Sequence, residues 1–147
     1  MFFQEQLMAS YNKFRQFVED LAKGVHNFTS DSTCSVTVAL CAAANAPVNT
    51  NAVLGDLTQI SYTNLSSRVV SNVTAEHTTG TVTFTADDLV LTASGSVATF
   101  RYVVLYNDDP TSPADPLIAW YDYGSDVTMS SGETFTIDFT SGFATLA

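Results

Sequence analysis

Two neighbouring runs of this sequence are apolar on both of the faces that a β-strand presents. They are FRYVVLY, residues 100–106, and LIAWYDY, residues 117–123, and a loop rich in Asp and Pro separates them. Side chains alternate between the two faces of a strand. Large apolar patches are rarely left in water, so both faces of these strands require a cover. In the first run the two faces carry Phe100, Tyr102, Val104 and Tyr106 against Val103 and Leu105.

After Gly24, the spacing of apolar residues is typical of short β-strands. In GETFTIDF, residues 132–139, apolar and polar side chains alternate, and TVTFT at 81–85 alternates likewise, as in strands with one buried face. The polar segment 43–56 is expected to cross an end of the fold. We predict a mainly β, antiparallel β-sandwich or jelly-roll-like domain, with strands near 35–42, 57–62, 68–74, 80–85, 88–92, 97–106, 117–123, 126–130, 133–139 and 143–146.

The N-terminal region has a helical period instead. Apolar side chains recur at helical spacing between Ser10 and Lys23, and Gly24 is placed as a stop. We therefore predict an arm and one amphipathic helix in residues 1–24, and the β-sandwich domain in residues 25–147. A chain of 147 residues fits one such folding unit. The apolar face of the helix carries Tyr11, Phe14, Phe17, Val18 and Leu21.

Two explanations account for the cover of the second apolar face. In the first, the N-terminal helix lies on the outer face of the sheet and makes it part of the core. In the second, another subunit covers it, because a helix of this length spans only about three strands. The two explanations are compatible. The helix would contribute Tyr11, Phe14, Phe17 and Leu21.

The charge of the chain argues against a nucleic-acid partner, and its short apolar runs argue against a membrane partner. The formal net charge is −10, with 5 Lys and Arg residues against 15 Asp and Glu residues, whereas a nucleic-acid surface requires clustered cations. No run reaches the roughly 18 apolar residues of a membrane span. We therefore expect neither a nucleic-acid nor a membrane partner. The cations are Lys13, Arg15, Lys23, Arg68 and Arg101.

No motif of enzyme chemistry stands out. Cys34 and Cys41 lie on one predicted strand roughly 23 Å apart, too far for a disulfide, and they lack the spacing of a zinc site. We expect both to be buried free thiols. His26 and His77 have no metal-binding spacing and are expected at the surface or in turns. The sequence predicts no catalytic, cofactor-binding or metal-binding residue.

Clustered carboxylates and aromatic residues leave weaker alternatives open. Asp-rich turns such as 107–109 offer oxygen ligands for calcium, but turns favour Asp for local reasons. Aromatic residues on the two apolar runs, if exposed on a sheet, would suit a carbohydrate-binding module; otherwise they belong to the core or to a subunit interface. They are Tyr102, Tyr106, Trp120, Tyr121 and Tyr123.

The order of several segments resembles a group of small virion structural proteins from tailed phages and prophages. The resemblance covers residues 8–147 and is carried by ASYNKFRQFVEDLAKGVHNF, SVTVALC, APVNTNAVLGDLTQI, FRYVVLYND, PLIAWYDYG, GETFTIDF and GFATL. These motifs are structural and contain no catalytic signature. The chain departs from the group after DLTQI, where SYTNLSSRVV lacks a Gly-rich turn.

The resemblance implies a head decoration or cement protein that binds the major capsid protein in the virion, commonly as a homotrimer. A tail, tube or fibre component is the alternative within the virion. We expect the runs 100–106 and 117–123 to build the core and part of a homo-oligomer interface, and the segment 1–23 to contact a neighbour or the capsid. The candidate interface residues are Tyr11, Phe14, Arg15, Phe17, Tyr102, Tyr106, Trp120 and Tyr121.

Overall fold

The computed structural model describes residues 9–29 and 34–147. The described chain is mainly β with one α-helix, as predicted. Two short 3₁₀ helices, η1 (Ala43–Asn45) and η2 (Leu54–Asp56), interrupt one long connection. The other elements are β1 (Ser10–Lys13), α1 (Arg15–Ala22), β2 (Val36–Cys41), β3 (Thr74–Thr78), β4 (Thr81–Thr85), β5 (Leu89–Thr92), β6 (Val97–Asn107), β7 (Leu117–Met129), β8 (Thr134–Ile137) and β9 (Ala144–Leu146).

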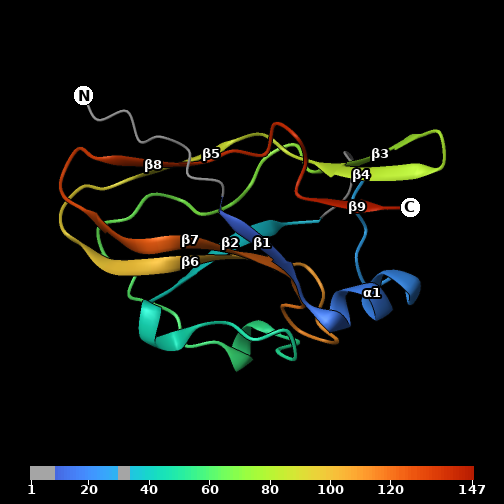
Figure 1. Ribbon diagram of the computed structural model, residues 1–147, viewed down its shortest axis with the longest axis horizontal. Coiled ribbons are helices and arrows are strands. Elements are labelled where there is room, and N and C mark those ends of the chain that lie inside the picture. The colour runs from blue at the N-terminus through green and yellow to red at the C-terminus, as the bar shows by residue number, and fades with distance from the viewer. Residues whose placement is uncertain (1–8, 30–33) are drawn as a thin grey trace.

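The strands form two layers, and a third layer without strands lies beneath them (Figure 1). The central sheet has the order β1-β7-β6-β2. Above it lie the pair β5-β8 and the three-stranded sheet β3-β4-β9. Every pairing between these strands is antiparallel. This arrangement is of the predicted β-sandwich class.

The long strands β6 and β7 form the middle of the central sheet. Val104 lies opposite Ala39 of β2 and Trp120 of β7, so these three side chains share the lower face. Val103 lies opposite Leu40 on the upper face. Both faces are shielded from solvent at this point, because Ala39, Leu40 and Val104 are 0% exposed. β2 and the segments 103–107 of β6 and 117–120 of β7 are therefore buried on both faces, as their sequence requires.

The upper face of the central sheet forms the main core. It packs against the inward side chains of β4, β5 and β8, whose outward neighbours are mostly threonines. Aromatic rings meet edge to face there, for example Phe100 on Phe135 with ring centroids 5.3 Å apart. Such contacts stabilise a core beyond the area that they bury.

The lower face is covered by the connection between β2 and the upper layer, residues 42–58. Leu54 and Leu57 pack against the lower cluster. Two backbone bonds fix this segment to β7 and its preceding loop: Leu117 N–H donates to Ala52 O, and Leu54 N–H donates to Asp115 O, both at 2.9 Å. Figure 1 shows the segment running beneath β6 and β7. The expectation that this loop crosses an end of the sandwich is wrong; it is the cover itself.

The N-terminal helix is shorter than predicted, and the one described side chain of this region in the lower cluster comes from Phe14, the residue just before the helix. Phe14, 0% exposed, joins the lower cluster and lies 4.5 Å from the ring of Trp120. Phe17 instead enters the main core, where its ring meets those of Phe28 and Phe84. A second subunit is not needed to bury this face of the sheet.

Residues 10–13 form β1 rather than the first turn of a helix. Pairing with β7 supplies backbone partners that an isolated helical turn would lack. The helix begins at Arg15, after Phe14 in an extended conformation, and ends before Gly24, whose φ of +72° is the left-handed conformation expected of a stop residue. The N-terminal arm expected at residues 1–7 lies outside the described residues.

Several other strand predictions need correction. The segments 57–62 and 68–73 form no strand, although Ile60 N–H donates to Leu40 O and Val70 N–H to Val36 O; Thr74, the end of the second prediction, begins β3. They line the outer edge of β2. The strands predicted at 117–123 and 126–130 are one continuous strand, β7.

Strand β3 was not predicted and is exposed along almost its whole length. It forms a hairpin with β4 through a two-residue turn, Thr79 and Gly80, both with positive φ, which is typical of a tight hairpin. The hairpin lies at one end of the upper layer (Figure 1).

The lower cover predicts an effect of mutation at Phe14. Phe14→Ala should lower the free energy of unfolding by about 3–5 kcal/mol, because the substitution leaves a cavity beside Trp120. Urea unfolding monitored by tryptophan fluorescence measures this loss. The matched control is Val48→Ala on the same cover, which should change stability by less than about 0.5 kcal/mol because Val48 is 52% exposed. A loss below about 1 kcal/mol for Phe14→Ala would contradict the assigned packing.

Candidate binding surface at the N-terminal edge strand

Strand β1 is the outermost strand of the central sheet and pairs on one side only, with β7. The pairing is anchored by aromatic contact, because the rings of Tyr11 and Tyr121 lie 5.5 Å apart. Burial raises the pKa of both phenols. No other described strand lies along the free side of β1. One edge of the central sheet is therefore open.

The free edge offers backbone hydrogen-bonding groups at alternate residues. Phe14 N–H donates to Ile118 O of β7 at 3.3 Å, and successive residues of an antiparallel strand turn their backbone groups to opposite sides. The N–H and C=O groups of Tyr11 and Lys13 therefore point away from β7. Both residues are exposed.

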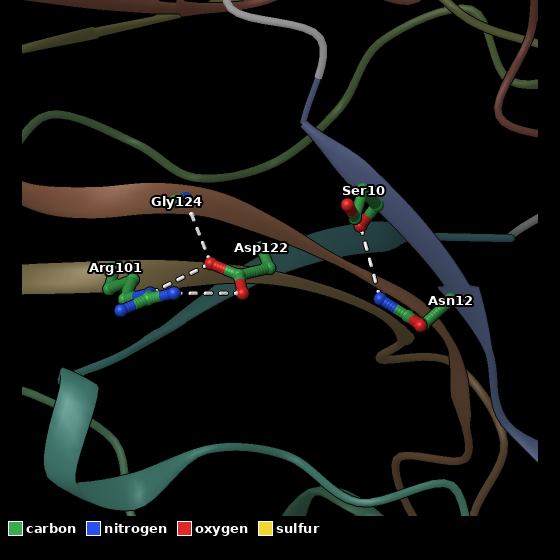
Figure 2. A network of polar contacts seen from close by, with 5 residues as sticks. All are labelled: Ser10, Asn12, Arg101, Asp122 and Gly124. Atoms are coloured by element: carbon green, nitrogen blue, oxygen red, sulfur yellow. Dashed lines mark hydrogen bonds and ion pairs between the residues drawn. The ribbon is translucent and has the colours of Figure 1, made fainter.

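Two sets of polar contacts lie near the upper end of this edge, one on β6 and β7 and one within β1 (Figure 2). Arg101 donates to both carboxylate oxygens of Asp122 at 2.8 and 3.1 Å, and Gly124 N–H donates to the same carboxylate at 2.8 Å. Arg101 holds the pKa of Asp122 below its usual range. Asn12 donates from its side-chain amide to Ser10 O at 3.1 Å. The carboxylate beside β1 is thus already paired.

The lower end of the edge carries two cations that form no salt bridge with any described residue. Among the described residues the salt bridges are Lys23 with Glu19 and Arg101 with Asp122. Arg68 lies over the ring of Tyr62 and donates to a backbone carbonyl. The remaining cations, Lys13 and Arg15, are exposed at the junction of β1 and α1. A locally positive site results, in a chain with a formal net charge of −10.

An open groove of about 330 Å³ adjoins these cations. Its wall is held in place by a bond from Arg15 N–H to Asn49 O at 3.0 Å. Sequence reasoning missed the groove, because its loop residues have no periodic pattern and Lys13 was placed on a helix. The lining residues are Asn12, Lys13, Val48, Asn49 and Trp120.

The structure divides the eight predicted interface residues into three groups. Tyr11 and Arg15 are exposed and belong to the edge surface. Tyr102 and Tyr121 are half-buried. The other four are buried within this single chain, where they serve as core: Phe14, Phe17, Tyr106 and Trp120.

Two of the five aromatic residues considered for a sugar platform are buried. Tyr106 is 5% and Trp120 is 8% exposed, and the Trp120 ring packs against Phe14. Stacking of a sugar requires an accessible ring face, and these two buried rings are too little exposed to offer one.

A second polar cluster lies between α1 and the end of β6. His26, expected at the surface, is 7% exposed because its ring stacks on Phe28 and contacts Phe17 edge to face. Its Nδ1 lies 3.3 Å from the side-chain amide nitrogen of Asn107. Asp20 is 2% exposed and accepts a bond from Gln16 at 3.0 Å.

Neither cysteine forms a disulfide, as predicted; Cys41 is buried, whereas Cys34 is only half-buried. Burial raises the pKa of both Cys34 and Cys41 to about 11, so neither is a ready nucleophile at neutral pH. Across residues 9–29 and 34–147, no three His, Cys, Asp or Glu side chains gather closely enough to hold a metal ion. No helix in the same ranges is long and apolar enough to cross a membrane.

Comparison with known proteins returns no match among protein families, curated proteins or solved structures.

The burial of His26 predicts a dependence of stability on pH. Burial lowers the pKa of His26 from 6.5 to about 4, and the charge of Asp20 opposes part of this change. The unfolded chain therefore binds a proton near pH 6.5 that the folded chain resists until about pH 4. The contribution of neutral His26 to the free energy of unfolding is complete above pH 6.5. The free energy of unfolding should fall by on the order of 2 kcal/mol as the pH decreases toward 4.

Urea unfolding at several pH values measures this effect. His26→Phe keeps a ring on Phe28 and should flatten the profile between pH 6.5 and 4. His77→Gln, in the exposed strand β3, should leave it unchanged. Equal slopes for the wild-type protein and His26→Phe would show that His26 is not the responsible group.

Proposed function

We propose that the protein is a virion structural protein that decorates and stabilises a phage head by binding the major capsid protein, as a homo-oligomer, with a trimer as the first expectation. The segment resemblance over residues 8–147 supports the lineage. The edge surface supports a function in binding, because it combines free backbone groups, unpaired cations and a groove.

The observation that carries the proposal is the free edge of β1 with Lys13 and Arg15. The rest of the central sheet is covered within the chain, so this edge is where the sheet remains available to another molecule. The segment is also the one that the sequence indicated for contact with a neighbour. The interior supplies the rigid support that such a surface needs.

Binding alone is sufficient for such a function. A protein that binds only the assembled shell stabilises it by its binding free energy. Contacts of this kind typically bury about 1,600 Å² in total. A four-residue edge supplies only part of that area, so we expect neighbouring loops to contribute.

Charge reversal at the edge tests the proposal. Lys13→Glu combined with Arg15→Glu should weaken coating of undecorated heads by about tenfold or more, since two favourable charge contacts become repulsive. Lys23→Glu is the matched control, because Lys23 already pairs with Glu19 on the exposed face of α1. Cosedimentation with purified heads and the melting temperature of the coated heads are the measurements.

Three results would contradict the proposal. The first is wild-type protein that does not sediment with heads. The second is wild-type protein that sediments only with isolated tails, which would favour a tail component. The third is equal coating by the double variant and by Lys23→Glu, which would remove the edge of β1 from the contact.

A further inference from the structure

The open edge of β1 has the features of a site for strand addition. In that mode of recognition an extended segment pairs with an exposed sheet edge; main-chain bonds supply affinity, and pockets for alternate side chains supply specificity. The backbone groups of Tyr11 and Lys13 point outward, and the groove of about 330 Å³ opens beside Asn12 and Lys13. Both components are thus present on one edge.

The opposite edge of the same sheet is not available. Residues 60–70 run along β2 and use its outward groups: Ile60 N–H donates to Leu40 O at 3.0 Å, and Val38 N–H donates to Arg68 O at 2.9 Å. Within the described part of the chain, β1 is therefore the edge at which the central sheet can be extended.

The local charge selects the kind of strand that fits. Within residues 9–29 and 34–147, Lys13 and Arg15 are exposed without a salt bridge, and Asp122, which lies opposite Ser10 of β1, is held by Arg101. An acidic segment would gain two charge contacts at this end of the edge, whereas a basic one would be repelled.

The same cations disfavour a second copy of this chain. Antiparallel pairing of two β1 strands would place one Lys13 at each end of a paired edge of four residues, about 13 Å long, with an Arg15 just beyond each end. A charge on a short edge strand is a common means of preventing self-pairing. Lys13 thus acts against self-association and in favour of an acidic partner.

We propose that β1 is a strand-addition site for an extended, acidic segment of a partner protein. The segment pairs with the outward backbone groups of Tyr11 and Lys13, its carboxylates contact Lys13 and Arg15, and one apolar side chain enters the groove between Val48 and Trp120. This inference rests on the proposed function in taking the edge of β1 as the contact surface.

The probe is an acetylated and amidated peptide of alternating Glu and Val residues, titrated into the full ¹⁵N-labelled chain. At saturation the amide exchange of Tyr11 and Lys13 should slow by about tenfold or more, because these groups become hydrogen-bonded. The amides of β3 serve as an internal control, since that edge carries Glu76 and no cation.

Two further comparisons separate strand pairing from simple charge attraction. Lys13→Glu combined with Arg15→Glu should weaken binding of the probe at least about tenfold, and Lys23→Glu should leave it unchanged. A probe of the same charge with alternate backbone nitrogens methylated should bind at least about tenfold more weakly, because it cannot pair with an edge.

Several outcomes would overturn the inference. They are absence of binding, equal binding of the methylated probe, and protection of the Tyr11 and Lys13 amides by a second copy in the absence of probe. Particle coating remains a separate readout. If the protein coats heads but does not bind the probe, the proposed function stands and strand addition is refuted. If it binds the probe but does not coat heads, strand addition stands and the proposed function is refuted.

Discussion

Burial of both faces of the central sheet is the constraint on which the rest of this structure depends. The row formed by Ala39, Val104 and Trp120 lies below the sheet, and Leu40 and Val103 lie above it. Paired strands hydrogen-bond with one another through their backbone groups. What remains is to shield the apolar side chains on both faces of the sheet from water. Two small sheets provide it above and the segment 42–58 provides it below. The shape of the molecule follows from these two covers.

The two covers end at β1, where the surface becomes polar and positively charged. β6 and β7 have a strand on both sides, and the segment 60–70 lies along the outer side of β2, whereas β1 presents backbone groups to the solvent beside Lys13 and Arg15. A stable interior and an open edge are complementary features, because a rigid sheet holds its outermost strand in a conformation ready for pairing. The proposals for this protein follow from that combination.

The sequence was informative where side-chain alternation matched burial. β4, β6 and β8 lie where their patterns place them, because one or both faces of each enter the core. The segment TAEHT has no apolar pattern and forms β3 only through its hairpin with β4. Nothing between Lys13 and Arg15 marks the change from strand to helix, because the apolar spacing continues through it. The groove and the lower cover depend on contacts distant in sequence, which periodicity does not record.

The turn at Thr79 and Gly80 has a practical consequence. It closes the hairpin at one end of the upper layer, and both residues are exposed. Neither residue belongs to either hydrophobic cluster or to the edge of β1. Exposed loop tips of this kind are the preferred sites of tolerated insertions. A reporter or epitope grafted there would be carried on the molecule without occupying the surface assigned to its partner.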